Sequence, residues 1–587
     1  MLYSELVKVY GALEATTSRL EMTDILSEFF AKADCRLLKR IIYLTQGQIF
    51  PDFYPLKLGM ADKLLLKSIA FTSGIKEQTI QDLYIKEGDP GVVALKIFEG
   101  KKQKTLFSEP LTLERVYENL RKIAEAQGSG SQDLKIRMLA DILHDASPVE
   151  AKYIARTVTG KMRLGVADMT VLDALSQAFA RKEDRETIER AFNITSDLGL
   201  VGEVLCKEGI EAVKRISVSV GNPIRAMLAE RLSSPQEILE KMGGLCAFEY
   251  KYDGVRVQAH IDCEKKIRLF SRRLEDLTEQ FPDVVSALRE AFVSKDAILE
   301  GECVPVDINT GEMLPFQEVS HRRGRKYDLS IAIEDYPVRT FLFDCLYLDG
   351  IDLTEKNFLE RRKALERCIR PSENVQLSEI KILSKVDEIE RFFEEALKDG
   401  CEGLMAKSIG EDSVYRAGAR GFLWIKYKKE YRSEMSDTVD LVVVGAFAGR
   451  GRRKGTYGAL LMATYNDKED RFETVCKLGS GFDDDMLAGL PSMLAPYKLQ
   501  GIHPRVWSNL EADYWFEPAV VLEVLGSEIT LSPTHTCSYS KIKRDAGLAI
   551  RFPRFTGRMR FDKNAREATT SDELLNMYKR QLKKIEE

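Results

Sequence analysis

The spacing of apolar residues changes near Pro223, and this change constrains the fold more than any other feature of the chain. Before Pro223, segments such as 113–126 (LERVYENLRKIAEA) and 146–158 (ASPVEAKYIARTV) carry apolar residues three and four positions apart, which predicts amphipathic helices. After it, runs such as 255–262 (VRVQAHID) and 339–348 (RTFLFDCLYL) are short and alternate, which predicts strands. A helical first part is therefore followed by a mixed part.

Strands dominate from about residue 434, for example at 441–447 (LVVVGAF), and a predicted helix over 571–587 follows them. A chain of 587 residues exceeds what one hydrophobic core can organise. We therefore predict a multidomain α+β protein with three domains: an all-helical domain at 1–220, a mixed α/β domain at 221–433, and a small β-barrel with a C-terminal helix at 434–587.

Composition indicates a globular protein and no membrane partner. Hydrophobic residues make up 44% of the chain and charged residues 30%, and no apolar run is long enough to cross a bilayer. The N-terminal segment is amphipathic rather than a charged-then-apolar signal peptide, so we expect a cytoplasmic location. The net charge of −5 neither indicates nor excludes nucleic-acid binding, because phosphate contact depends on local positive surface.

The 10 cysteines are scattered from Cys35 to Cys537 and form no C-x-x-C pair. This spacing argues against a zinc ribbon, and the length of the chain argues against a disulfide framework. We expect the cysteines to be reduced and mostly buried.

The segment EYKYDGVR, from Glu249 to Arg256, contains a candidate for covalent chemistry. Lys251 stands at the end of a predicted strand, where lost hydration and neighbouring cations would supply the neutral amine that a nucleophile needs. The Asp253–Gly254 pair is also a strong hairpin-turn signal, so this segment alone leaves both interpretations open.

Charged pairs on two further predicted strands suit bound ions. Glu300 and Glu302 lie two residues apart and so share a face, where repulsion between carboxylates favours a cation such as Mg²⁺. Lys426 and Lys428 also share a face, and an anion such as a triphosphate between them would offset their repulsion. The alternative for the lysines is an exposed edge strand protected from aggregation.

Three weaker signals accompany these pairs. Phe341 and Phe343 share a strand face, where one ring suits a nucleobase, although a strand phenylalanine is more often core. Gly403 permits close backbone approach beside the carboxylate of Glu402. The polar loop 159–165 leads into a helix for which we predict an N-cap at Asp168.

Together these segments resemble the nucleotidyltransferase motifs of ATP-dependent DNA ligases of the archaeal and eukaryotic replicative type. The motifs stand in the family's order: KYDG (251–254), SRRLEDLT (271–278), ILEGE (298–302), LFDCL (342–346), EGLMAK (402–407) and WIKYKK (424–429), with RFPRF (551–555) and RFDK (560–563) as the C-terminal motif. The likeness covers nearly the whole chain. No motif is missing, and ILEGE carries Glu300 where relatives often have Asp.

The resemblance implies a role for each matched position. Lys251 would be the nucleophile that becomes adenylated. Nucleotide binding would fall to Glu249 at the adenine edge, Arg256 near the ribose or phosphate, Arg272 at the AMP or nicked-strand phosphate, Glu302, Phe343 stacked on adenine, Arg420, and Lys426 and Lys428 at the α-phosphate. Glu302 and Glu402 would bind the metal.

The resemblance also implies what each domain does. The helical domain would bind DNA, with Lys161 and Arg163 on the phosphate backbone, where contacts position a protein without reading sequence. The middle domain would be the adenylation domain and the barrel an OB-fold. Arg560 and Lys563 of the barrel would contact the departing pyrophosphate.

A short segment, QKTLF, resembles the motif by which archaeal ligases dock on the sliding clamp. Gln103, Leu106 and Phe107 would make that contact, since exposed apolar side chains beside a glutamine suit a small hydrophobic pocket. The alternative is a helix-entry loop whose Phe107 packs inward.

The implied activity is sealing of nicks in double-stranded DNA by a monomer that uses ATP and Mg²⁺, in replication, repair and recombination. The alternatives are a non-catalytic DNA-binding clamp of the same fold, and an RNA ligase or capping-type nucleotidyltransferase, which the large helical domain disfavours. Use of NAD⁺ in the bacterial manner is disfavoured because we find neither a nicotinamide-binding module nor a four-cysteine zinc site.

Overall fold

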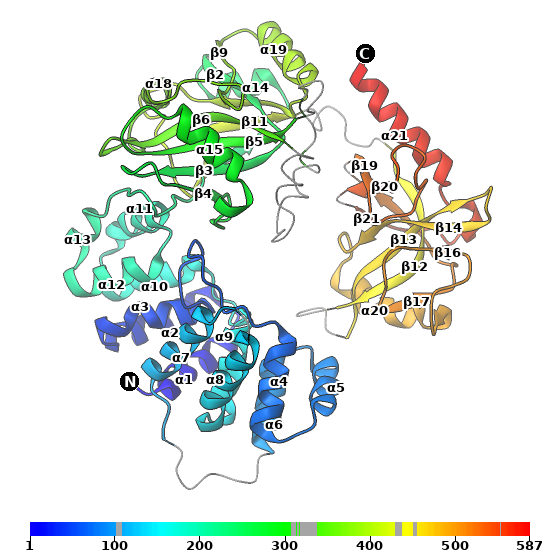
Figure 1. Ribbon diagram of the computed structural model, residues 1–587. Coiled ribbons are helices and arrows are strands. Elements are labelled where there is room, and N and C mark those ends of the chain that lie inside the picture. Colours follow the sequence, from blue (N-terminus) through cyan, green and yellow to red (C-terminus); the bar gives the residue numbers. More distant parts are fainter. Residues whose placement is uncertain are drawn as a thin grey trace. The chain divides into compact units, whose positions relative to one another are not determined.

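The computed structural model describes the chain apart from residues 101–108, 129, 307–312, 314–315, 317–336, 429–436, 450–454, 527, 552 and 587. The chain divides into two compact units, Met1–Lys428 and Lys429–Glu587. In the first unit an all-helical part, from α1 (Tyr3–Glu14) to α13 (Ile210–Lys214), precedes two sheets along the chain. The second unit consists mainly of strands (Figure 1). Within the described ranges, no helix is both long and apolar enough to span a bilayer.

The helical part of the first unit is shown in blue to cyan in Figure 1. Its helices are α1 (Tyr3–Glu14), α2 (Arg19–Lys32), α3 (Cys35–Thr45), α4 (Asp62–Ser73), α5 (Glu77–Glu87), α6 (Pro90–Glu99), α7 (Leu113–Glu125), α8 (Ser131–Asp145), α9 (Pro148–Val158), α10 (Asp168–Phe179), α11 (Arg185–Thr195), α12 (Leu198–Glu208) and α13 (Ile210–Lys214). The helices predicted over 113–126 and 146–158 are confirmed by α7 and α9.

Local signals explain where these two helices begin. The Thr112 side chain accepts a hydrogen bond from the Arg115 backbone and so caps α7. Ser147 and Glu150 form a capping box at α9, with Pro148 at the first helical position. The apolar faces of both helices then enter one continuous core of the helical part.

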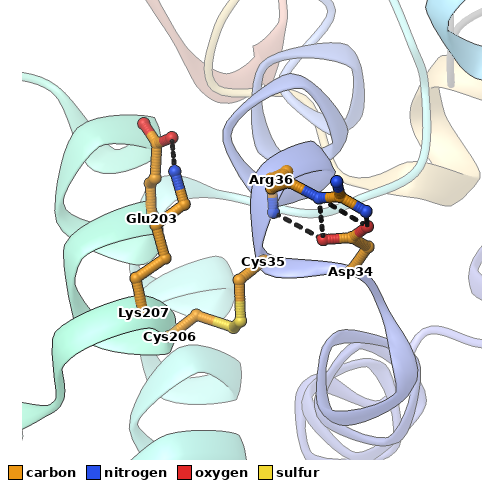
Figure 2. The surroundings of a disulfide bond; sticks show 6 residues. All are labelled: Asp34, Cys35, Arg36, Glu203, Cys206 and Lys207. Atoms are coloured by element: carbon orange, nitrogen blue, oxygen red, sulfur yellow. Dashed lines mark hydrogen bonds and ion pairs between the residues drawn. A yellow bond between two sulfur atoms is a disulfide. The ribbon is translucent and has the colours of Figure 1, made fainter.

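A disulfide bond joins Cys35 to Cys206, and it corrects the expectation that all cysteines are reduced. It links the first turn of α3 to the last turn of α12, with the ion pairs Asp34–Arg36 and Glu203–Lys207 on either side (Figure 2). The two cysteines lie 171 positions apart, so no local spacing pattern announces the bond. Of the remaining eight cysteines, all are buried except one, which confirms the second half of the expectation.

Asp168 is not the N-cap that the sequence suggested. The cap position of α10 is Ala167, which makes no side-chain cap, and Asp168 is the first helical residue. Its carboxylate instead accepts hydrogen bonds from Gln46 Nε2 at 2.9 Å and Arg225 Nη1 at 3.0 Å. Asp168 therefore ties the helical part to the segment that leads into the sheets.

Two sheets follow, drawn mostly in green in Figure 1. The first sheet has the order β1 (Leu228–Arg231), β11 (Arg420–Lys428), β10 (Gly403–Lys407), β2 (Cys246–Lys251) and β9 (Ile380–Leu383). The second has the order β4 (Ile267–Ser271), β3 (Val255–Ile261), β5 (Ala297–Pro305), β6 (Val338–Leu348) and β7 (Ile351–Asp352), with β8 (Val375–Leu377) paired to β6. The predicted strands at 255–262 and 339–348 are confirmed as β3 and β6.

Helices cover one face of each sheet. The helices α14 (Pro235–Lys241) and α19 (Val386–Lys398) pack on the first sheet, and α15 (Pro282–Ala291) and α18 (Phe358–Cys368) pack on the second. The other faces of the two sheets contact each other through aromatic side chains: Phe343 of β6 meets Trp424 of β11 edge to face, with ring centroids 6.2 Å apart. Residues on these inner faces therefore meet although they belong to different sheets.

The second unit is β-rich. Its main sheet contains β12 (Val439–Ala448), β13 (Tyr457–Asn466), β14 (Arg471–Leu478), β15 (Lys498–Leu499), β16 (Val506–Trp507), β17 (Tyr514–Phe516), β18 (Val521–Leu525) and β21 (Arg554–Met559). A separate pair is formed by β19 (Glu528–Ser532) and β20 (Gly547–Arg551). The helices are α20 (Asp484–Leu494) and α21 (Ser571–Glu586), and the predicted helix over 571–587 is confirmed by α21.

Candidate active site

Lys251 is the last residue of β2, and a short turn takes the chain from there into β3 of the other sheet. Because β2 pairs with β9 and β10 whereas β3 pairs with β4 and β5, the KYDG segment is not a hairpin turn. The turn passes so close to β5 that a Cβ atom on Gly254 would lie 2.3 Å from the Cys303 carbonyl oxygen. The structure therefore places Lys251 where the two sheets meet.

Glu402 holds two lysines together at this point. Lys251 Nζ donates a hydrogen bond to Glu402 Oε2, and Lys428 Nζ lies 2.6 Å from the same oxygen. Gly403 is paired with Lys251 on one side and Lys428 on the other, and a Cβ atom there would lie 2.3 Å from the Tyr427 carbonyl oxygen. Burial acts to raise the pKa of Glu402, but the two lysines outweigh it and keep that pKa below its ordinary value.

Lys426 lies two residues before Lys428 on the same face of β11, and the opposite face carries the fully buried Ile425 and Tyr427, as predicted. Burial lowers the pKa of Lys426, and the neighbouring Lys428 and Arg231 lower it further. Within the described part of the chain Lys426 makes no ion pair. Cations that lower one another's pKa are stabilised when an anion binds between them, so this face suits a polyphosphate.

Two further carboxylates lie beside Lys251. Burial raises the pKa of Glu302 to about 7, against the opposing effect of the Lys251 charge. Burial also raises the pKa of Asp253 to about 6, and the Glu402 charge adds to it. The sequence interpretation missed Asp253, because its place in an Asp-Gly pair indicated only a turn.

Arg256 lies directly opposite Glu302 on β5, but its ion pair is with Glu300. Its Nη2 is 2.8 Å from Glu300 Oε2, and the same oxygen accepts a hydrogen bond from Tyr415 Oη at 2.9 Å. Glu300 is 1% exposed, so its charge is offset by protein groups. This corrects the interpretation of Glu300 and Glu302 as one cation-binding pair: only Glu302 remains available.

Arg272 extends the cationic region along the second sheet. It follows β4 directly and is exposed. Burial of part of the side chain lowers its pKa, and so do the charges of Arg256 and Arg420. Arg420 is itself exposed at the start of β11. The predicted cations of both sheets therefore lie close enough to repel one another.

The deeper end of the same region is aromatic. Phe343 is half-buried and meets Trp424 edge to face, with centroids 6.2 Å apart. Glu249 is buried and pairs with Lys407, whose Nζ lies 4.8 Å from the centroid of Phe343. The structure thus brings the expected adenine contacts, Glu249 and Phe343, together around Lys407, which the sequence interpretation did not single out.

The remaining predicted residues lie elsewhere. In the second unit, Arg560 pairs with Asp440 and Asp562 at 2.7 Å each, and Lys563 pairs with Asp440 at 2.6 Å. In the helical part, the exposed Lys161 and Arg163 alternate with the buried Met162 and Leu164, and Arg163 Nη2 donates to the Gly88 carbonyl at 2.9 Å. Gln103, Leu106 and Phe107 fall outside the described residues.

Comparison with known proteins decides the family. Family models for the "DNA ligase N terminus", the "ATP dependent DNA ligase domain" and the "ATP dependent DNA ligase C terminal region" match residues 2–176, 226–428 and 453–563. "DNA ligase 2" of Thermofilum pendens is 52% identical over 99% of this chain and 98% of its own length. "DNA ligase" of Caldivirga maquilingensis is 49% identical over the same shares of both chains. The chain belongs to the ATP-dependent DNA ligase family.

Membership of this family confirms the predicted fold class, a multidomain α+β protein with a helical first region, a nucleotidyltransferase region and a β-rich last region. A solved structure named "Pmar-Lig_PreS3" supports the fold alone: it is 18% identical, has a TM-score of 0.54, and the match covers 94% of this chain and 99% of that chain. The predicted enzyme class, an ATP-dependent DNA ligase, is confirmed with the family, and the catalytic mechanism is the family's.

Proposed function

We propose that this protein seals nicks in duplex DNA, and that Lys251 is the residue that carries AMP. The observation behind this assignment is the position of Lys251 at a strand end, in contact with Glu402 and Lys428 and next to Lys426. The amine of Lys251 thus lies beside two further lysines, in a cluster of cations suited to phosphates. That cluster continues into an aromatic and carboxylate region suited to a purine base.

The reaction proceeds in three transfers. Lys251 Nζ, after losing a proton, attacks the α-phosphorus of ATP, so that a phosphorus–nitrogen bond forms and pyrophosphate leaves. An oxygen of the DNA 5′-phosphate then attacks that phosphorus, and the lysine amine is released. Finally the 3′-hydroxyl oxygen attacks the 5′-phosphate phosphorus and AMP leaves. Lys426 and Lys428 would offset charge that develops on the phosphate oxygens, the largest contribution in reactions of this kind.

The family uses a divalent cation, and we assign Mg²⁺ to Glu302 and Glu402. No group of three or more acidic, histidine or cysteine side chains in the described part of the chain is arranged to hold a metal. Two carboxylates fit Mg²⁺ nevertheless, because this ion commonly takes one or two protein carboxylates and completes its coordination with substrate phosphates and water. When bound, it would offset the negative charge of the triphosphate.

We further propose that the three predicted ranges, 1–220, 221–433 and 434–587, act as a DNA-binding domain, an adenylation domain and an OB-fold domain. Lys161 is exposed on a loop, and Arg163 is exposed beside it while its guanidinium contacts the Gly88 carbonyl and Asp89; both cations suit contacts to the DNA backbone. We keep a monomeric state as part of this proposal. We also retain the sliding-clamp contact through 103–107, and it rests on the sequence motif alone.

The deciding experiment follows a label from ATP to DNA. The protein is incubated with α-labelled ATP and Mg²⁺, and labelled protein is then given nicked duplex DNA. We expect one covalent label per chain, loss of that label to the nick, and a sealed strand. Lys251→Arg keeps the charge but should take up no label, whereas Lys381→Arg, on the neighbouring strand β9, should behave as the unchanged protein.

The clamp and the capping-type alternatives each predict a different result. A non-catalytic clamp would bind the nick but take up no label while well folded. A capping-type enzyme would be labelled by GTP rather than ATP. Label on the Lys251→Arg variant at the normal rate would show that another residue is the nucleophile.

A further inference from the structure

A buried ion pair closes the deep end of the nucleotide region. Lys407 Nζ lies 2.5 Å from Glu249 Oε2, and each side chain is only 2% exposed. Three aromatic rings surround the ammonium group, with centroids 4.8 Å away for Phe343, 4.8 Å for Phe358 and 4.6 Å for Trp424. Ring faces stabilise a cation in a site with little water.

The pair leaves one oxygen of Glu249 unused. Oε2 faces Lys407, whereas Oε1 is buried and accepts no hydrogen bond from the described residues. Arg362 Nη1 lies 3.6 Å from Oε1, but that guanidinium donates its hydrogen bonds to Ser378 and Glu366. A buried acceptor without a donor is costly, so this oxygen is suited to receive a hydrogen bond from a ligand.

The strand register places this oxygen at a definite point relative to the nucleophile. Glu249 and Lys251 lie two residues apart on β2 and so share a face, roughly 7 Å apart along the strand. On β10, Lys407 pairs with Trp424 of β11, at the end of the sheet opposite to the Gly403–Lys428 pair. One face therefore runs from phosphate-binding lysines to a carboxylate among aromatic rings, in the order of a nucleotide's phosphate and base.

We propose that Lys407 is a positioning residue that holds Glu249 ionised, with Oε1 turned to the base, and so makes the site selective for a 6-aminopurine nucleotide over a 6-oxopurine nucleotide. This inference rests on the proposed function, because it assumes that the base enters between Glu249 and Phe343. It goes further because it names Lys407 as the residue that keeps Glu249, the proposed contact to the base, ionised.

The chemical reason lies in what each form of Glu249 can do. An ionised carboxylate only accepts hydrogen bonds, whereas a protonated one also donates. The 6-amino group of adenine donates to an ionised carboxylate, but the 6-oxo group of guanine or hypoxanthine would place a second acceptor against it. A protonated Glu249 could donate to the 6-oxo group, and the discrimination would be lost.

The surroundings of the pair show why Lys407 is needed. Burial raises the pKa of Glu249, with Lys407 and Arg362 opposing that rise and Asp344 adding to it. Asp344 is itself paired with Arg361 in a fully buried ion pair, so it does not compete strongly for Lys407. Removing Lys407 would take away the main charge that opposes protonation and leave Glu249 to bind a proton.

The test compares ATP with ITP, which differs from ATP only in its 6-oxo group and the proton on N1. Rates of covalent labelling are measured over a range of each nucleotide, for the full-length protein and for Lys407→Met. In the variant we expect KM for ATP to rise, and the ATP-to-ITP ratio of kcat/KM to fall, by on the order of tenfold to a hundredfold, the effect of one charge-assisted hydrogen bond. The rate at saturating ATP should change much less.

Lys381→Met is the matched control, because Lys381 belongs to the same sheet as Lys407 but pairs with Glu395 rather than with Glu249. Its ATP-to-ITP ratio should equal that of the unchanged protein. If Lys407→Met does not fold, Lys407→Gln is measured in its place, since its amide can donate to Glu249 without a charge. A variant that is labelled more slowly but keeps the full ATP-to-ITP ratio would overturn the inference. Absence of labelling in the unchanged protein would instead overturn the proposed function.

Discussion

Replacing the disulfide cysteines should destabilise the helical part strongly. Cys35 and Cys206 lie 171 positions apart, and closing a loop of that length removes entropy from the unfolded chain. The chain-entropy relation gives about 17 cal/mol/K for this loop, which is about 5 kcal/mol at 25 °C. The helices α3 and α12 also pack through buried residues such as Leu38 and Leu205, so the variant should still fold.

The assay is chemical unfolding followed by far-UV circular dichroism, with Cys35→Ser/Cys206→Ser compared with the unchanged protein. Residual contacts in the unfolded chain reduce the ideal value, so we expect a loss of about 2–5 kcal/mol in the free energy of unfolding. Cys263→Ser is the control, because Cys263 is an exposed free thiol and its replacement should change the free energy by less than about 0.5 kcal/mol.

A thiol count makes this result interpretable. Denatured, unreduced protein should show eight reactive thiols, and reduced protein all 10. If eight thiols are counted and the double variant is as stable as the unchanged protein, the loop-closure reasoning is wrong. Ten thiols before reduction would show that the bond itself does not form.

Two further predictions concern the second unit and the pH dependence of stability. Arg560→Ala should slow covalent labelling by ATP on the order of 10²-fold, as expected when a contact to the leaving pyrophosphate is lost, yet a nick that already carries AMP should still be closed. Equal losses in both assays would instead indicate that Arg560 serves the fold through Asp440. Burial lowers the pKa of His260 to about 3, with Arg268 adding to the effect, whereas the unfolded chain titrates near 6.5. The unfolded state therefore binds more protons below about pH 6.5, and stability should fall between there and pH 3 by about 1.4 kcal/mol per pH unit. Urea unfolding at pH 7 and pH 5 should show this loss, and His260→Gln should lose about 2 kcal/mol less over that interval; parallel pH profiles would contradict it.

Local sequence pattern was sufficient for many of the elements and for the face on which most charged site residues lie, but it did not single out Asp253 or Lys407. Alternation with a period of two put Lys426 and Lys428 on one face of β11 and Ile425 and Tyr427 on the other, because successive side chains of a strand point to opposite faces. Helices such as α9 were equally predictable, because their caps and apolar spacing lie within the helix itself. The roles given to the individual site residues stay predictions.

Long-range partners were decided only by the tertiary structure. Glu249 meets Lys407, Asp168 meets Arg225, and Cys35 meets Cys206 because strand register and helix packing bring together segments that are far apart in the chain. No spacing rule within one segment encodes such a meeting. The sequence by itself determined which charged and aromatic groups are present and which face of each element they occupy. The pairing of strands distant in the chain, such as β3 with β5, determined which charges are neutralised inside the protein, as with Glu300 and Arg256, and which remain for a ligand, since a buried charge is stable only beside a partner.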